Sequence, residues 1–201
     1  GEKDGEQAAG LEVAKRISPM LEELGLGCDA VDEQSLASGA LGARKVALLA
    51  YNPRLAPDAM EALESFVAGG GKLIACYSLP PRLARLLGLK RGEYVRPDQR
   101  GRFAEMRFDA PAIQGMPKAV RQASWNITRS APADASARIA GRWFDESGRD
   151  TGEPALLLGE QGAFFTHILL GDDRDAKKQL LAALVGHFWP DAWQQMADRS
   201  F

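Results

Sequence analysis

The stretch that decides the fold is Lys45–Gly88, KVALLAYNPRLAPDAMEALESFVAGGGKLIACYSLPPRLARLLG. Val46–Tyr51 and Leu73–Tyr77 are short apolar runs without alternation, which predicts strands covered on both faces, as in a parallel sheet between helices. Between them, apolar residues recur at helical spacing over Met60–Val67, behind a proline that favours a first helical turn. Gly69–Gly71 then ends the helix. We therefore predict a βαβ unit whose two strands are adjacent and parallel, joined by a right-handed crossover.

Apolar spacing and turn residues divide the rest of the chain into further elements. We expect a helix over Gln7–Leu24, kinked or divided at Pro19 because proline lacks a backbone donor. A last helix should run to Phe188, capped by Asp172 or Asp173. The remaining expected elements are strands at Cys28–Val31, Phe103–Phe108, Ser124–Thr128, Ala137–Phe144, Pro154–Leu158 and Ala163–Leu170, a short helix at Arg82–Leu87, and turn-rich connections at Lys90–Arg102 and Ser130–Ser136.

These elements predict one α/β domain over residues 1–201. We expect a three-layer α/β/α, flavodoxin-like architecture with a mostly parallel sheet. The last three expected strands are separated by short turn signals rather than helices. The C-terminal half should therefore add antiparallel strands to the sheet.

One element of a doubly wound domain is missing. Such a domain normally opens with a strand, whereas the first expected element here is a helix. Either the opening strand lies upstream of this chain, or the sheet takes its first strand from elsewhere. The chain also begins at Gly1 and has no signal peptide, so we expect it to be a piece of a larger protein.

Composition excludes several classes of partner. The net charge of -2 and the isoelectric point near 5.8 argue against nucleic acid, whose backbone requires a clustered basic surface. A locally basic stretch from Arg82 to Arg107 is interrupted by acidic residues and is typical of a solvated surface. No apolar run approaches the ~20 residues of a membrane span. Cys28 and Cys76 lie at opposite ends of their expected strands, so we expect two free thiols.

The candidate chemistry lies at the carboxyl ends of the strands, where doubly wound sheets bind ligands. Cys76 closes a parallel strand ahead of a helix, where class I glutamine amidotransferases carry their nucleophile, and His167 resembles their catalytic histidine in position. If the chain is catalytic, these two residues would form the reactive pair. However, Cys76 lacks the flanking glycines of a Gly-x-Cys-x-Gly turn, and Leu169 replaces the family's orienting glutamate. Losing an orienting acid costs ~10⁴-fold in triad hydrolases, so we expect no hydrolysis of glutamine.

Metal and cofactor signals are weak. The two histidines and two cysteines have unrelated spacings and match no zinc pattern. Asp172, Asp173 and Asp175 could hold a cation, but helix capping explains them more simply. Gly69–Gly71 precedes a strand rather than following one, so it is not a phosphate loop. We expect no metal and no cofactor.

Longer motifs carry a family resemblance. LAYNP (Leu49–Pro53) and FVAGGGKLI (Phe66–Ile74) resemble the amidotransferase-like superfamily, which includes ThuA-like proteins and the trimerisation domain of some β-galactosidases. IQGMP (Ile113–Pro117) looks like the His-Pro-Ile-x-x-Gly-Leu-Pro loop of those proteins, without the His-Pro. More narrowly, Leu11–Phe188 resembles the amidotransferase-like domain of bacterial family 10 glycosylhydrolase-like proteins. That resemblance implies a secreted or periplasmic location, and a separate barrel domain that does the hydrolysis.

Two functions remain open. One is a non-catalytic accessory domain, for ligand binding or assembly, of a larger bacterial carbohydrate-active protein, with carbohydrate and the other domains of that protein as partners. The other is a Cys-dependent amidotransferase or small-substrate hydrolase. A retained ligand cleft would be formed by Tyr51, Asn52, Tyr77, Ser78 and His167. The alternative for Tyr51 and Tyr77 is that they only cap the core.

Overall fold

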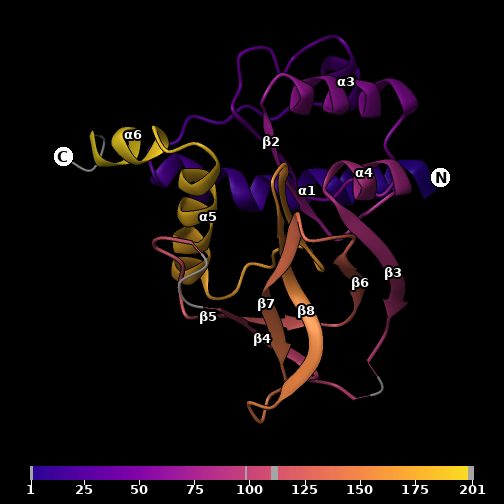
Figure 1. Ribbon diagram of the computed structural model, residues 1–201, viewed down its shortest axis with the longest axis vertical. Coiled ribbons are helices and arrows are strands. Elements are labelled where there is room, and N and C mark those ends of the chain that lie inside the picture. The colour runs from indigo at the N-terminus through magenta and orange to yellow at the C-terminus, as the bar shows by residue number, and fades with distance from the viewer. Residues whose placement is uncertain (1, 98, 110–112, 199–201) are drawn as a thin grey trace.

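The computed structural model describes residues 2–97, 99–109 and 113–198, with the backbone alone for residues 2–8. The helices are α1 (Glu2–Glu23), α2 (Glu33–Ala37), α3 (Pro57–Ala68), α4 (Pro81–Leu86), α5 (Arg174–Phe188) and α6 (Ala192–Asp198). The strands are β1 (Val46–Leu49), β2 (Lys72–Cys76), β3 (Leu89–Val95), β4 (Phe103–Phe108), β5 (Ala119–Ser124), β6 (Ile127–Pro132), β7 (Ala137–Phe144), β8 (Asp150–Gly159) and β9 (Gly162–Phe165). Figure 1 shows their arrangement.

The central βαβ unit forms as predicted. β1 and β2 are adjacent and parallel, with Val46 opposite Lys72, and β9 continues the parallel ladder on the other side of β2. In α3, Met60, Leu63 and Val67 are buried, because their spacing puts them on one side of the helix. This confirms the two strands and the helix that joins them.

The rest of the main sheet is antiparallel. Its strand order is β1-β2-β9-β8-β7-β4-β5, and the pairings from β9 to β5 are all antiparallel. The added antiparallel strands of the C-terminal half are therefore confirmed. A mostly parallel sheet is wrong, because two pairings are parallel and four antiparallel among the described strands of the main sheet. Hairpins such as β8–β9 close directly and need no helix.

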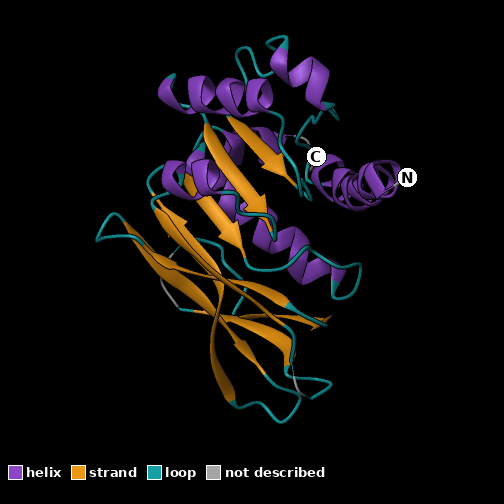
Figure 2. Cartoon of the chain, turned by 90° about the vertical axis from the view of Figure 1, so that its right-hand side faces the viewer, coloured by secondary structure: helices purple, strands orange, loops and turns teal. Residues whose placement is uncertain are grey.

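Hydrophobic residues collect on the two sides of the sheet. One cluster joins α1 and α5 to the sheet through residues such as Ile17 and Leu181. The other joins α3 and α4 to the opposite side through residues such as Leu63 and Leu83. Figure 2 shows the parallel strands between these helices, while the long antiparallel strands extend beyond them. The fold is mixed α/β, with helices covering the parallel part of the sheet.

The helical predictions hold with shifted ends. α1 starts earlier than expected and continues through Pro19, so the proline does not divide it. The chain between Glu33 and Ala37 forms a short helix, and α6 was not predicted. None of the helices in the described part of the chain has the length and apolar character needed to cross a membrane.

Two strand predictions and one loop prediction are wrong at their positions. Cys28–Val31 is not a strand. The single strand expected at Ser124–Thr128 is two strands, β5 and β6, with Trp125 and Asn126 between them. β6 also occupies the first part of the loop expected at Ser130–Ser136.

Two further boundaries moved for reasons of pairing. Lys90–Arg102 was expected to be a turn-rich connection, yet β3 forms there because its backbone pairs with β6 in a second, two-stranded sheet. The strand expected over Ala163–Leu170 ends at Phe165. Beyond it, the Leu170 N–H donates to the Gln122 side chain instead of to a strand. His167 therefore lies just past β9.

Candidate functional site

Tyr77 marks the sharpest backbone turn at the carboxyl end of β2. Its φ of 65° lies in the left-handed region, which bulky residues rarely occupy. The Tyr77 N–H donates to the Phe165 carbonyl at 2.8 Å, and the Ser78 N–H to the Cys76 carbonyl at 2.7 Å. In enzymes with a strained strand-to-helix turn, the nucleophile occupies the position that Tyr77 has here. Here a tyrosine stands there, followed by Ser78.

Cys76 lies one residue before the turn, inside the sheet. The residue is 1% exposed, and burial raises the pKa of its thiol to about 12. Thiolate, not thiol, is the nucleophilic form, so Cys76 is protonated at neutral pH and enclosed. Both Cys76 and Cys28 are free thiols.

Aromatic rings gather around Tyr77. Its ring centroid lies 5.9 Å from that of Tyr51 and 5.5 Å from the imidazole of His167. The Trp125 ring stands edge-on to the same imidazole at 4.7 Å. The Tyr77 hydroxyl interacts with the side chains of Tyr94 and Asn126, and burial raises its pKa.

We call Tyr51, Tyr77, Tyr94, Trp125, Asn126 and His167 the aromatic site. Trp125 and Tyr94 are each 55% exposed, which is unusual for such large rings. Tyr51 and Tyr77, whose rings contact each other, are half-buried. The site thus combines two solvent-exposed rings with the buried polar side chains of Asn126 and His167.

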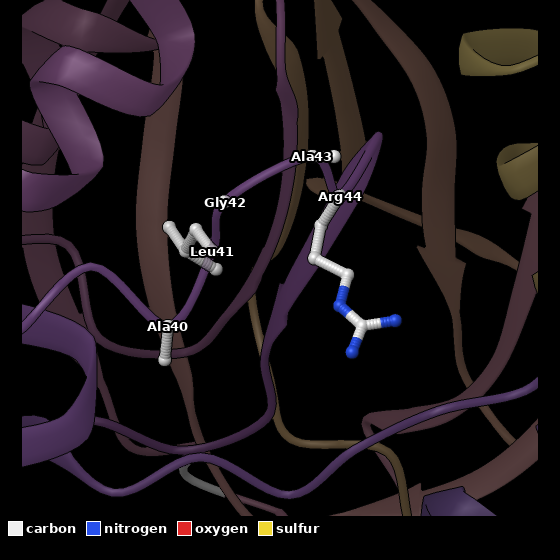
Figure 3. Close-up of a pocket in the computed structure, with 5 residues that line it drawn as sticks. All are labelled: Ala40, Leu41, Gly42, Ala43 and Arg44. Carbon is white, nitrogen blue, oxygen red and sulfur yellow. The ribbon is translucent and has the colours of Figure 1, made fainter.

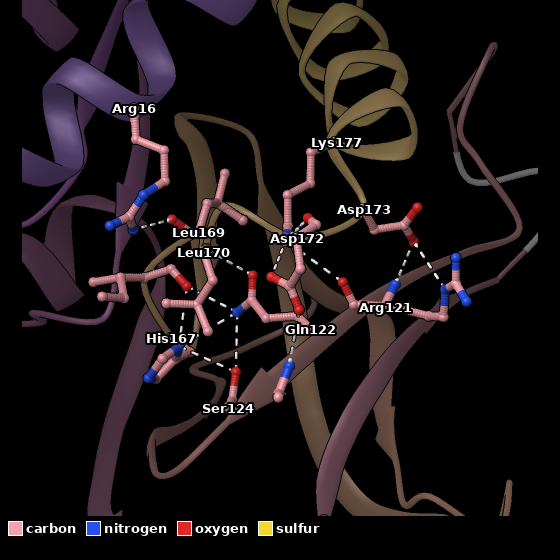
Figure 4. A network of polar contacts seen from close by, with 12 residues as sticks. Arg16, Arg121, Gln122, Ser124, His167, Leu169, Leu170, Asp172, Asp173 and Lys177 are labelled. Atoms are coloured by element: carbon pink, nitrogen blue, oxygen red, sulfur yellow. Dashed lines mark hydrogen bonds and ion pairs between the residues drawn. The ribbon is translucent and has the colours of Figure 1, made fainter.

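His167 is held by neutral groups. Its Nδ1 lies 3.0 Å from the Ile168 carbonyl, 3.1 Å from the Ser124 hydroxyl and 3.3 Å from the Gln122 amide nitrogen. Gln122 and Ser124 are labelled beside His167 in Figure 4, together with Leu169, which is a buried apolar residue. No carboxylate among the described residues contacts the ring, so an imidazolium would have no negatively charged partner. The expectation that Leu169 cannot orient the histidine agrees with this geometry.

Burial also fixes the charge of His167. It lowers the pKa of the imidazole to about 4, so the ring is neutral at pH 7. When Nδ1–H donates to the Ile168 carbonyl, the lone pair on Nε2 faces outward from the network. Nε2 is buried and has no hydrogen-bond partner among the described residues. An unpaired buried acceptor of this kind is rare and is satisfied by a ligand or a water.

Asn126 supplies the second unpaired atom. Its Nδ2 donates to the Tyr94 hydroxyl at 2.7 Å, while its buried Oδ1 has no partner within the described part of the chain. Asn126 lies beside Trp125 in the β5–β6 connection. The aromatic site therefore contains two buried hydrogen-bonding atoms without a partner in the described part of the chain.

A polar network anchors the segment that carries His167. Gln122 donates to the Ile168 carbonyl at 2.8 Å and accepts from the Leu170 N–H at 2.9 Å (Figure 4). The Asp172 carboxylate accepts from the Ala123 N–H at 3.2 Å and from the buried Lys177 ammonium at 2.9 Å. Residues of β5 therefore hold the imidazole of His167 in position, although His167 itself follows β9.

The expected capping of the last helix is wrong in detail. Asp173 stands at the N-cap position of α5, but its side chain makes no capping bond and its φ is 50°. The Asp173 carboxylate instead accepts from the Arg121 N–H at 2.7 Å.

Among the described residues, no group of three or more His, Cys, Asp or Glu side chains could hold a metal ion.

The structure brings together three of the residues predicted for a ligand cleft. Tyr51, Tyr77 and His167 meet, whereas no side-chain bond from Asn52 or Ser78 to the aromatic site is present among the described residues. Tyr94, Trp125 and Asn126 were missed. They lie in segments predicted as a turn-rich connection and as the middle of one strand. The sequence signal that could have identified this part of the site is the neighbouring pair Trp125 and Asn126 in a polar stretch.

A surface hollow lies apart from the aromatic site. Its volume is about 330 Å³, and it is lined by the loop residues Ala40, Leu41, Gly42, Ala43 and Arg44 (Figure 3). This loop precedes β1, at the end of that strand opposite Tyr51. The Arg44 guanidinium pairs with Asp29. The hollow has none of the converging polar groups that mark a specific site.

Comparisons with known proteins identify the fold. No family model and no curated protein matches the sequence. A protein of Bacteroides uniformis assigned as ThuA-like has a similar structure, with a TM-score of 0.67 and 12% identity over 90% of this chain and 86% of the other. The α-L-fucosidase isoenzyme 2 of Paenibacillus thiaminolyticus matches with a TM-score of 0.63 and 18% identity over 88% of this chain, but only 28% of its own.

A third similar structure is a protein of Thermoplasma acidophilum assigned as a GMP synthase component. Its TM-score is 0.58 and its identity 10%, over 91% of this chain and 90% of the other. At such low identities the similarities establish the fold alone. The fold that the family resemblance implies is thereby confirmed: the chain has the fold of ThuA-like and glutamine amidotransferase-like proteins.

Proposed function

We propose that this domain is a non-catalytic accessory module of a larger bacterial carbohydrate-active protein, of the family 10 glycosylhydrolase-like type, and that it binds carbohydrate at the aromatic site. The observation that carries the proposal is the occupant of the strained turn after β2, which is Tyr77. The neighbouring thiol, Cys76, is buried and protonated. Covalent chemistry of the amidotransferase kind has no nucleophile in this arrangement.

The alternative, a Cys-dependent hydrolase, also lacks an activated base. The imidazole of His167 has neutral partners, and its ring packs against those of Tyr77 and Trp125. A Cys–His pair requires hydrogen-bond reach between the sulfur and the ring. The geometry favours a binding role for His167.

Binding of a sugar fits the chemistry of the aromatic site. Exposed rings such as Trp125 and Tyr94 present large rigid apolar faces, on which the C–H face of a pyranose can lie. Asn126 Oδ1 and His167 Nε2 are buried acceptors without a partner among the described residues, and a hydroxyl donor that reached either atom would pair with it. A site built to pair with hydroxyls discriminates against molecules that lack them.

An accessory role in a longer protein has support from the similar structures. This chain spans 28% of the fucosidase chain that it resembles, so a domain of this fold occurs within a larger carbohydrate-acting protein. We further infer that the architecture is a variant of the three-layer flavodoxin-like fold. The helices on both sides of β1, β2 and β9 support that assignment.

Replacing Trp125 with alanine tests the binding site. Calorimetric titration of an oligosaccharide panel should give binding to the wild-type chain that weakens about tenfold or more in Trp125→Ala, because a central aromatic contact is lost. Trp125 is largely exposed, so the variant should remain folded. The matched control is Val31→Ala, an exposed apolar residue outside the aromatic site, which should bind as wild type does. Absence of binding across the panel, or equal binding by Trp125→Ala, would contradict carbohydrate recognition here.

A further inference from the structure

The edge of the main sheet at β5 is bonded to side chains. β5 stands at the end of the strand order and pairs with β4 alone among the described strands. Unpaired backbone groups on such an edge can pair with another chain. Here the Arg121 N–H donates to the Asp173 carboxylate at 2.7 Å. The Ala123 N–H donates to the Asp172 carboxylate at 3.2 Å. The Lys177 ammonium donates to the Arg121 carbonyl at 3.5 Å.

These contacts reproduce the pattern of a neighbouring strand (Figure 4). A strand offers carbonyl oxygens to the N–H groups of an edge and N–H donors to its carbonyls. The carboxylates of Asp172 and Asp173 take the first role, and the ammonium of Lys177 takes the second. The start of α5 and the residues just before it therefore satisfy groups of β5 that a further strand would satisfy.

The backbone of Asp173 is strained, and its side chain contacts β5 instead of capping α5. Its φ of 50° lies in the left-handed region, which costs free energy for a residue with a Cβ atom. An aspartate at the N-cap normally accepts from a backbone N–H of its own helix, but the Asp173 side chain makes no such bond. The guanidinium of Arg121 lies 3.8 Å from the carboxylate, farther than the Arg121 N–H. The backbone of β5 is therefore the closer partner of Asp173.

Lys177 is a second costly feature that the same contact explains. The residue is 0% exposed, although lysine is almost never fully buried without a partner. It also places a cation near the N-terminus of α5, the positive end of the helix dipole. Its ammonium donates to one oxygen of the Asp172 carboxylate at 2.9 Å, while the other oxygen accepts from the Ala123 N–H. Lys177 therefore holds the Asp172 carboxylate against β5.

We propose that Asp172, Asp173 and Lys177 form a clasp that closes the β5 edge against strand pairing with a second copy of this chain. The clasp engages two donors and one acceptor through which the edge would otherwise pair. A second copy fits this edge because two antiparallel β5 strands offer each other the same groups about a twofold axis. When Arg121 lies opposite Ala123, the two Arg121 side chains do not face each other directly, so like charges are kept apart.

Two neutral substitutions of Asp173 test the clasp. Glycine and asparagine both tolerate a left-handed φ, so Asp173→Gly and Asp173→Asn should fold. Only asparagine keeps a side-chain oxygen that can accept from the Arg121 N–H. Hydrogen exchange of the Arg121 amide should be about tenfold or more faster in Asp173→Gly than in the wild-type chain, and close to wild type in Asp173→Asn. Equal exchange rates in the two variants would overturn the role of Asp173.

Removing the whole clasp tests the pairing of two copies. The open variant carries Asp172→Ala, Asp173→Gly and Lys177→Met, so no buried charge is left without its partner. In analytical ultracentrifugation, its average mass should rise with concentration above that of the wild-type chain at the same concentration. In the associated form, the amides of Arg121 and Ala123 should be protected from exchange, which locates the contact at β5.

The fold of the open variant is verified at the centre of the sheet. The Leu73 N–H donates to the Gln161 carbonyl at 3.0 Å, and its amide should stay protected. If it does not, Asp173→Gly, measured by the same two methods, decides the proposal. A folded variant whose mass does not exceed that of wild type would overturn the proposal. So would association that leaves the Arg121 and Ala123 amides unprotected, because the copies would then meet elsewhere.

Discussion

Gly162→Ala is expected to lower the free energy of unfolding by about 3 kcal/mol or more. We predict no larger effect from adding a single methyl group to this chain. A Cβ at Gly162 would lie 1.9 Å from the Leu73 carbonyl oxygen and 3.0 Å from the Leu73 nitrogen. Gly162 begins β9 opposite Leu73 of β2. Because backbone atoms cannot turn aside as a flexible side chain can, the parallel pairing itself must shift. Chemical denaturation of the two proteins measures the difference.

The matched control is Gly27→Ala. Gly27 is exposed, and a Cβ there would meet no heavy atom within 4 Å. Its stability should change by less than about 0.5 kcal/mol, as is usual for surface positions. A small effect of Gly162→Ala, comparable to that of Gly27→Ala, would contradict the close pairing of β2 with β9.

His167 is expected to make the domain less stable in acid. Its folded-state pKa of about 4 lies below the ordinary value of 6.5, so between these values the unfolded chain binds a proton that the folded chain does not. The contribution of His167 to the free energy of unfolding is therefore fully present above about pH 6.5 and is lost as the pH falls toward 4. The contribution of His167 to this loss between pH 7 and pH 4 is about 3 kcal/mol. Denaturation curves across this range should show a shallower loss for His167→Gln.

The second histidine of the chain provides the comparison. His187 is exposed near the end of α5, in contrast to the buried His167, and partial desolvation lowers its pKa. His187→Gln should therefore change the pH dependence less than His167→Gln does. Carboxylates titrate in the same range in all three proteins and cancel in the comparison. Identical slopes for wild type and His167→Gln would show that the imidazole is not buried as a neutral ring.

Local sequence patterns were sufficient for the βαβ unit but not for the edges of the sheet. Val46–Tyr51, Leu73–Tyr77 and the helix between them are specified by apolar runs and glycines close in sequence. β3 is polar and largely exposed, and it forms because β6 supplies its backbone partners. In contrast, Cys28–Val31 has a sequence suitable for a strand but no pairing partner among the described strands, and it does not form a strand. Pairing between distant segments cannot be inferred from one segment alone.

For a related reason, only part of the candidate site could be predicted from the sequence. Tyr51, Tyr77 and His167 follow parallel strands, whose carboxyl ends meet at one edge of the sheet. Tyr94 and Trp125 come from the β3–β6 part of the molecule, and nothing local places that part against the parallel strands. The one-residue offset between Cys76 and the strained turn at Tyr77 also depends on where β2 ends. That offset decides whether the Cys76 thiol is buried inside the sheet or exposed at the turn.

Ammonia release from glutamine tests the central claim that this site binds and does not catalyse. With the turn occupied by Tyr77 and the Cys76 thiol buried, we expect release by the purified chain to equal the buffer blank, and Cys76→Ala to be indistinguishable from wild type. Release above the blank that disappears in Cys76→Ala would contradict the account, because it would require a reactive thiolate at a position where the structure has a buried thiol.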